Sequence, residues 1–482
     1  MPRGRRRATV PAAGRVVARP RPGRYQPPDG AADPLPPAVH PCYRMAMQQR
    51  GGDTDPGWGE ASRYAAHLDR GWDHLDRGAV DAARRSAEEA HRLRPEDPDA
   101  LYLLGQVAAA AGSPDEALAW FERALEVEPT YVSPAIASAL VALYDLDAPE
   151  QAVDAAERAL GMETLGPLDA LDMQLVAAEA EIRLGREGHA MARLSEMPEH
   201  ETLEAACRLV ALRRDNPDAP LPHPDEMPDP AMAEAAAALF YDPDGEPNDP
   251  EEFEGVCQRI LELGARLART WQRLDRPDAA TYVARLLVHG MPNAADAWYT
   301  LADAHMASGD PETGIRAALR SAILEASDPI PEFVPDADTL RGKVVEMLAT
   351  APHPAVRQLV ERPVPVFVHV ADRVPPELLL DGVDPRVAVL ALGPRGGERD
   401  HEIMGLSVYR RGLAHHAGHG DAVLGVLHEL LYDEVGHALS LSDDERRALL
   451  DDAWERSGRR VPASDGTDDD PQDAPGGRRY DA

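Results

Sequence analysis

From about Trp58 onward, apolar residues recur every three to four positions, which is the spacing of amphipathic helices. Within residues 98–131 the helices form a unit whose key positions are apolar, small or turn-forming: Leu101, Leu104, Gly105, Gly112, Ala117, Phe121, Ala124 and Pro129. The preceding 34 residues repeat this register, with Gly71, Gly78, Ala83, Ala90 and Pro95 at the corresponding positions. The pattern therefore predicts antiparallel helix pairs that repeat along the chain.

This period and its glycine and proline positions are typical of the tetratricopeptide repeat (TPR). Gly105 is expected to let the two helices of a pair approach closely, and Pro129 is expected to end the second helix. Residues 132–165 keep the pattern with a one-residue shift, and a late repeat is legible around Trp298 and Gly309. Because one hairpin cannot bury its own apolar stripe, we expect the hairpins to stack into a right-handed arch.

Beyond Asp328 the period changes from helical to alternating. Residues 364–370 place valine at every second position, and 387–392 and 403–409 are short apolar segments, so three strands are predicted. Helical spacing returns at residues 421–439 and 443–456. The prediction is a mainly α protein, a TPR-type α-solenoid followed by a small α+β domain of about 130 residues.

Changes in composition and pattern divide the chain into six predicted parts. They are a basic, proline-rich disordered arm (1–55), TPR-like repeats (56–215), an acidic, proline-rich insertion with a short helix (216–253), helical repeats (254–331), the α+β domain (332–461) and a disordered acidic tail (462–482). The first 44 residues hold nine arginines and ten prolines. They are either an upstream-extended start, with Met45 or Met47 as the true beginning, or a nucleic-acid-binding or targeting arm.

Charge and cysteine content exclude several classes of protein. Acids outnumber bases by 84 to 50, for a formal net charge of -34, which argues against nucleic-acid and anionic-membrane binding. The three cysteines are far apart and no apolar run would span a bilayer, so a cytoplasmic protein is expected. The expected partner is a protein or peptide on the TPR arch. The arginine-rich composition is typical of a GC-rich, bacterial-type genome.

The densest set of chemically capable residues lies at 426–447. Asp433 and His437 are four positions apart in a predicted helix and therefore share one face, with Glu434 beside it and Asp443 downstream. In the zinc peptidase motif HExxH, two histidines bind the metal and the glutamate is the general base. Here Asp433 occupies the position of the first histidine.

Residues 365–455 resemble the minimal zincin metallopeptidase domain, whose motif reads approximately HExxHxxGxxD. Upstream segments also look alike, namely 374–379, 381–386 and the strand ending in Tyr409-Arg410-Arg411. The resemblance implies a zincin-like fold with Zn²⁺ as cofactor, with Asp433, His437 and Asp443 as metal ligands and Glu434 as the catalytic base. Ser440 stands where that family has glycine, which matters if the turn there needs a positive φ.

Three functions remain open from the sequence. The first is an active zinc metallopeptidase that uses Glu434. The second is a TPR interaction protein whose zincin-like domain can bind a metal but is catalytically weak or inactive. The third is a metal-free interaction scaffold. The second is favoured, because two anionic ligands would reduce the acidity of a metal-bound water.

Other candidate residues are interpreted as structural. His428 is nine positions from His437 and faces the opposite side of the helix, so it is expected on the helix face or supporting a ligand. His415, His416 and His419 are expected in a solvated loop, and the acids of the repeats form a solubilising face or attract a basic peptide. Trp120 and Trp298 are expected to pack between repeats.

Overall fold

The structure is a computed structural model that describes residues 58–457 except 217–222, 225–226, 228, 242–246, 394–402 and 419. The predicted arm (1–55) and tail (462–482) lie outside the described residues. The chain divides into two compact units. Unit 1 runs to Pro331 and also contains Arg373–Val387, and unit 2 consists of Glu332–Asp372 and the chain from Ala388 onward.

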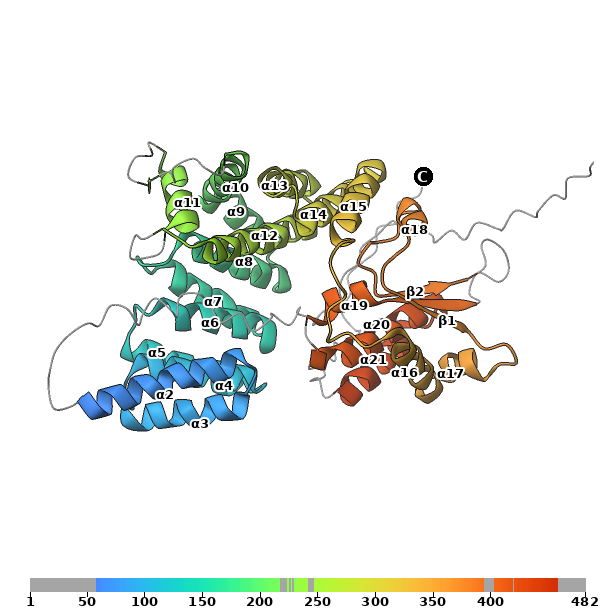
Figure 1. Ribbon diagram of the computed structural model, residues 1–482, viewed down its shortest axis with the longest axis horizontal. Helices are drawn as coiled ribbons and strands as arrows, with labels where there is room; N and C mark the ends of the chain where they lie inside the picture. The colour runs from blue at the N-terminus through green and yellow to red at the C-terminus, as the bar shows by residue number, and fades with distance from the viewer. Residues whose placement is uncertain are drawn as a thin grey trace, which may run out of the picture. The chain divides into compact units, whose positions relative to one another are not determined.

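Unit 1 is built of helices that follow one another in hairpins (Figure 1). They are α2 (Trp58–Asp76) with α3 (Val80–Leu93), α4 (Pro98–Ala110) with α5 (Pro114–Val127), α6 (Val132–Leu140) and the π-helical turn η1 (Val141–Asp145) with α7 (Pro149–Leu160), α8 (Pro167–Arg183) with α9 (Glu187–Glu196), α10 (Glu199–Asp215) with α11 (Pro230–Phe240), α12 (Pro250–Arg273) with α13 (Pro277–Gly290), and α14 (Ala295–Ala307) with α15 (Pro311–Glu325). The helix pairs that the repeat register predicts are present.

The sequence explains where these hairpins turn and why their helices lie close. Turn residues with positive φ separate the paired helices, and they are glycine in four hairpins and aspartate in two: Gly78, Gly112, Gly185, Gly309, Asp147 and Asp275. Proline commonly opens the second helix, where its missing N–H costs nothing. A Cβ atom at Gly105 would collide with the ring of Phe121, which confirms the predicted close approach of α4 and α5.

The one-residue shift in the third hairpin has a structural cause. Its first helix ends in the π-helical turn η1, in which the amide of Leu146 donates to the carbonyl of Val141 at 3.0 Å. A π-turn accommodates one more residue than an α-turn. The helix therefore contains one extra residue, and the hairpin turn falls at Asp147, one position later than the 34-residue spacing of Gly78 and Gly112 predicts.

The core of unit 1 runs along the stacked hairpins. Three clusters of buried apolar side chains follow one another along the chain, within residues 64–141, 125–180 and 168–318. Alanines at the predicted helix crossings, such as Ala117 and Ala124, are fully buried. Each cluster draws side chains from more than one hairpin, as expected where a single hairpin cannot bury its own apolar face. No helix among the described residues is both long and apolar enough to cross a membrane.

Unit 2 contains a three-stranded sheet, with its strands where the alternating pattern predicts them. The strands are β1 (Phe367–Ala371), β2 (Val389–Leu392) and β3 (Gly405–Tyr409), in the order β1-β3-β2. β1 pairs with β3 in parallel, with Phe367 opposite Gly405, and β2 pairs with β3 antiparallel, with Val389 opposite Val408. The central strand β3 is buried along its whole length.

Five α-helices and a short 3-10 helix accompany this sheet in the described part of unit 2. They are α16 (Ala337–Thr350), α17 (Pro354–Glu361), α19 (Arg410–Ala417), the 3-10 helix η3 (Gly420–Ala422), α20 (Val423–Ala438) and α21 (Asp443–Ser457). α20 packs against β2 and α21, and so lies between the sheet and the last helix. The predicted helices at 421–439 and 443–456 are thus present.

Two features differ from the sequence-based expectations. The segment Arg373–Val387, with the short helix α18 (Pro376–Leu380), belongs to unit 1 although the sequence pattern groups it with residues 332–461. His415 and His416 lie in the last turn of α19 and not in a loop. The helix continues to Ala417 because Gly418, with φ of 67°, is the first residue that turns the chain away. His419 lies outside the described residues.

Candidate functional site

The predicted metal-ligand pair lies together on α20. The Nδ1 atom of His437 is 3.0 Å from Oδ1 of Asp433 and 2.9 Å from the Asp433 carbonyl oxygen. Both side chains are partly exposed, at 31% and 33%. Four residues along a helix bring two side chains to one face, as predicted from the spacing. The Nδ1 side of the imidazole is therefore engaged within α20 itself.

Glu434, the predicted general base, is bonded to the sheet. Its Oε1 atom accepts a hydrogen bond from the backbone amide of Ala391 in β2, at 2.9 Å. β2 pairs only with β3 among the described strands, so the Ala391 amide finds its acceptor on α20. The carboxylate of Glu434 consequently helps to join α20 to β2.

Asp443 is linked to His437 through Arg446, a residue that the zinc-peptidase motif does not include. Arg446 contacts Nε2 of His437 through one terminal nitrogen and Oδ1 of Asp443 through the other. Asp443 and Arg446 are three residues apart in the first turn of α21, a spacing that favours ion pairs. That spacing was the available signal, but the approach of Arg446 to His437 depends on how α21 folds back on α20.

This arrangement does not fit a single zinc ion held by Asp433, His437 and Asp443. Asp433 contacts the imidazole directly at Nδ1, whereas Arg446 stands between Asp443 and the ring, with one terminal nitrogen at Nε2 and 3.4 Å from Nδ1. One imidazole nitrogen binds one ion, with the other ligands gathered on that side. Among the described residues, no three histidine, cysteine, aspartate or glutamate side chains are grouped so that they could hold a metal ion.

The turn between α20 and α21 shows why glycine would suit position 440. Ser440 has a φ of 54°, and the amides of Ser440 and Leu441 donate to the carbonyls of His437 and Gly436 at 2.9 and 3.0 Å. These two bonds form a Schellman motif, in which the residue at positive φ is usually glycine. The condition stated from the sequence, that the turn needs a positive φ, is met.

His428 is a core residue of unit 2. It is 5% exposed, and its ring meets the ring of Tyr432 edge-on with centroids 4.3 Å apart. Burial lowers the pKa of His428, which keeps the imidazole neutral near pH 7. Tyr432 in turn donates its hydroxyl to the carbonyl oxygen of Met347, at 3.1 Å. His428 therefore has a packing role on the side of α20 away from His437.

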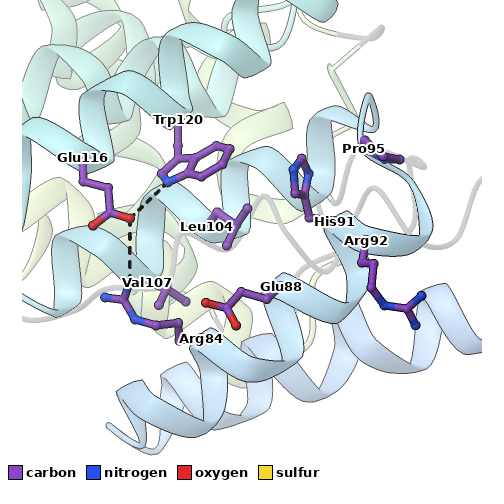
Figure 2. Close-up of a pocket in the computed structure, with 9 residues that line it drawn as sticks. All are labelled: Arg84, Glu88, His91, Arg92, Pro95, Leu104, Val107, Glu116 and Trp120. Atoms are coloured by element: carbon purple, nitrogen blue, oxygen red, sulfur yellow. Dashed lines mark hydrogen bonds and ion pairs between the residues drawn. The ribbon is translucent and has the colours of Figure 1, made fainter.

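A second candidate site is a pocket in unit 1 with a volume of about 390 Å³. Figure 2 shows it between α3, α4 and α5, with the indole of Trp120 on one wall. Its lining combines apolar and charged side chains: Arg84, Glu88, His91 and Arg92 from α3, Pro95 from the following loop, Leu104 and Val107 from α4, and Glu116 and Trp120 from α5. The pocket is formed by residues of the first two hairpins together.

Polar contacts hold the wall of this pocket in place. The indole Nε1 of Trp120 donates to Oε1 of Glu116 at 3.5 Å, and Arg84 lies 3.7 Å from the same carboxylate oxygen. The His91 ring meets Trp120 edge-on, with centroids 5.5 Å apart. Trp120 was predicted to pack between repeats, and it does pack against the buried cluster of the first hairpins. It also lines the pocket.

Hairpins with glycine or aspartate at the turn and alanine at the helix crossing give unit 1 a helical, tetratricopeptide-repeat-like solenoid fold. The tetratricopeptide repeat family matches residues 68–130 and 270–329. The first match covers the hairpin of α4 and α5 with most of the preceding one. The second covers the hairpin of α14 and α15 with all of α13 and the end of α12. The chain therefore contains tetratricopeptide repeats at both ends of unit 1.

Several known proteins are similar to part of this chain. The chain is 44% identical over 50 residues to the human tetratricopeptide repeat protein 7B, a match that spans 10% of this chain and 6% of that protein. Similar solved structures include the pilus biogenesis factor PilW (15% identity, TM-score 0.37) and PilF of Pseudomonas aeruginosa (14%, 0.35), each covering 56% of this chain and 95% of its own. The tetratricopeptide repeat protein YrrB (14%, 0.28) covers 50% and 93%.

Proposed function

We propose that this protein is a TPR interaction protein that binds a protein or peptide through the Trp120 pocket, and that unit 2 does not act as a peptidase. The pocket between α3, α4 and α5 is the observation that carries the proposal. It combines a volume of about 390 Å³ with an aromatic wall and a few charged groups. Binding sites in proteins usually have this composition.

The lining indicates which kind of partner group would enter. Leu104, Val107 and Trp120 offer an apolar surface to an aliphatic or aromatic side chain. Arg84 and Glu88 lie beside it and can pair with polar or charged groups of the same partner. Tryptophan in a pocket is the residue type that most often dominates binding energy at interfaces. An apolar side chain flanked by charged ones is therefore the expected ligand motif.

Selection from a displayed random peptide library on the purified chain tests this proposal. Peptides that use the pocket should lose at least about 30-fold in affinity for Trp120→Ala, as for a hot-spot residue. Leu212→Ala is the matched control, because Leu212 is 62% exposed on α10 and lies outside the pocket. Selected peptides that bind both variants equally, or a library without binders, would rule the pocket out as the partner site.

For unit 2, the contacts of Arg446 support the absence of peptidase activity. The guanidinium engages both His437 and Asp443, two of the three residues that the zincin resemblance implies as ligands. It brings a positive charge close to where a zinc ion bound by those two residues would lie, which disfavours the metal. Zinc binding by Asp433, His437 and Asp443 stays a prediction, as does a catalytic role of Glu434.

Elemental analysis of the purified chain separates the three possible functions. No stoichiometric zinc indicates a metal-free scaffold. Zinc without proteolysis indicates a structural metal. Zinc with proteolysis that Glu434→Gln abolishes, while the metal stays bound, would establish an active peptidase and overturn the proposal for unit 2. Glu429→Gln on the same helix is a suitable control, because Glu429 is outside the DExxH motif.

A further inference from the structure

The segment Arg373–Val387 belongs to unit 1, although both strands that flank it in sequence belong to unit 2. Its helix α18 packs on α15. At its start, Arg373 donates to the carbonyl oxygen of Glu325 at 3.2 Å and also to that of Asp328, at the end of α15. The segment therefore lies on the last tetratricopeptide hairpin of unit 1, formed by α14 and α15.

The end of the segment inserts an arginine into a site made of two acids and an aromatic ring. A terminal nitrogen of Arg386 donates to Oε1 of Glu325 at 2.7 Å and also to Oδ1 of Asp296. Its guanidinium carbon lies 4.2 Å from the centroid of the Tyr299 ring, a cation–π distance. The side chains of Arg386 and Glu325 are only 15% and 7% exposed. Two carboxylates and a ring face are the groups that select a guanidinium over an ammonium.

The same hairpin also binds the acid two residues earlier. The Tyr299 hydroxyl donates to Oδ2 of Asp384 at 3.0 Å. The other carboxylate oxygen of Asp384 accepts from the backbone amide of Arg386 at 2.7 Å, which folds Asp384-Pro385-Arg386 into a compact turn. Asp296 and Tyr299 are three residues apart on one face of α14. Tyr299 thus contacts both charged residues of the turn.

The internal occupant fits this site imperfectly. The Nε atom of Arg386 is buried and has no hydrogen-bond partner among the described residues. A buried donor without an acceptor costs free energy. This cost weakens the contact of the chain's own arginine, relative to an arginine with every donor paired.

We infer that the α14–α15 hairpin is a binding site for a partner peptide of the pattern Asp-x-Arg, and that Asp384-Pro385-Arg386 is an internal ligand that competes for it. This inference goes beyond the proposed function, since it uses a different hairpin and does not involve the Trp120 pocket. Either can fail without the other.

The test uses the full-length chain and a fluorescein-labelled peptide with the sequence of residues 381–388, DGVDPRVA, measured by fluorescence anisotropy. Arg386→Ala is expected to bind this peptide at least about tenfold more tightly than the wild type, because a tethered ligand no longer competes. The peptide with glutamine in place of arginine should not bind. Adding Asp296→Asn to the Arg386→Ala variant should abolish binding, whereas adding Asp278→Asn, on α13, should not.

Two results would overturn the inference. If the Arg386→Ala variant keeps the wild-type circular dichroism and melting temperature yet does not bind the peptide, the segment is a permanent brace and the inference is wrong. If that variant does not fold, hydrogen exchange of the wild type decides. A large excess of peptide must then speed amide exchange within residues 382–388, and unchanged exchange overturns the inference.

Discussion

The Nε atom of Arg266 lies 2.8 Å from Oε1 of Glu179, and both side chains are almost buried, at 17% and 8% exposure. Arg266 belongs to α12 and Glu179 to α8, so the pair joins two helices that are far apart in sequence. Asp172 contacts the same guanidinium at 2.5 Å, and the Tyr144 hydroxyl donates to Glu179 at 2.6 Å. A network of buried charges thus fixes how α8 meets α12.

Removing the charge of Glu179 should destabilise unit 1. Glu179→Gln leaves the buried guanidinium with Asp172 alone, so we expect the free energy of unfolding to fall by about 3 kcal/mol, the lower end for breaking a buried pair. Urea unfolding measures the change. Glu122→Gln, at an exposed position of α5, is the control and should stay within about 0.5 kcal/mol of the wild type. An equally small effect of Glu179→Gln would show that the pair contributes nothing net.

The same carboxylate should make unit 1 sensitive to acid. Burial raises the pKa of Glu179. The charge and hydrogen bond of Arg266, together with the hydrogen bond from Tyr144, lower this pKa by more than burial raises it. The net pKa is therefore below its usual value. Such a group stabilises the fold above its unfolded pKa, and this contribution is lost as the pH falls through its folded pKa. The wild type should therefore lose stability below about pH 4.3, the usual pKa of glutamate. In a pH series of urea unfolding, Glu179→Gln should lose less, and parallel curves would contradict the assignment.

Alanine substitution should change the stability of unit 1 in opposite directions at a turn glycine and at a helix glycine. Gly112 has a φ of 72°, and no atom lies within 4 Å of a Cβ built there, so only backbone strain opposes a side chain. Gly112→Ala should lower the free energy of unfolding by about 1 kcal/mol. Gly255, inside α12 and equally unobstructed, should respond oppositely, with Gly255→Ala gaining up to about 1 kcal/mol. Thermal unfolding of the two variants checks both signs, and equal shifts would exclude the conformational explanation.

Replacing Ser440 with glycine should stabilise unit 2. Its φ of 54° in the Schellman motif strains a residue that carries a side chain, so Ser440→Gly should raise the free energy of unfolding of unit 2 by up to about 1 kcal/mol. The same exchange at Ser195, an exposed helical position of α9, should lower stability instead. A loss of stability in Ser440→Gly, measured by denaturant unfolding, would show that the serine hydroxyl contributes more than the strain costs.

Much of the fold of unit 1 could be predicted from the sequence, because its determinants are local. Gly105 indicates a helix crossing and Gly112 a turn within one hairpin, and glycines occur again 34 residues before each of them. The alternating valines before Ala371 likewise report one strand. The misplaced histidines, His415 and His416, show the limit of this approach, since small residues nearby suggested a loop where the chain stays helical.

The parts that could not be predicted depend on contacts between distant residues. Arg266 and Glu179 are 87 positions apart, and Arg386 and Asp296 are 90 apart, so no local pattern pairs them. At the candidate metal site, the spacing placed Asp433 and His437 on one face correctly. The approach of Arg446 to His437 arises only when α21 folds against α20, which the motif itself does not encode.

The placement of Arg373–Val387 has a consequence for the way the protein responds to proteases. The polypeptide passes between the units three times, at residues 331–332, 372–373 and 387–388. A single cut after Pro331 would leave the C-terminal fragment carrying the piece that packs on α15. The two fragments should therefore remain associated under native conditions and separate only in denaturant. No single cleavage, and no single genetic truncation, would therefore separate the two units and leave both of them intact.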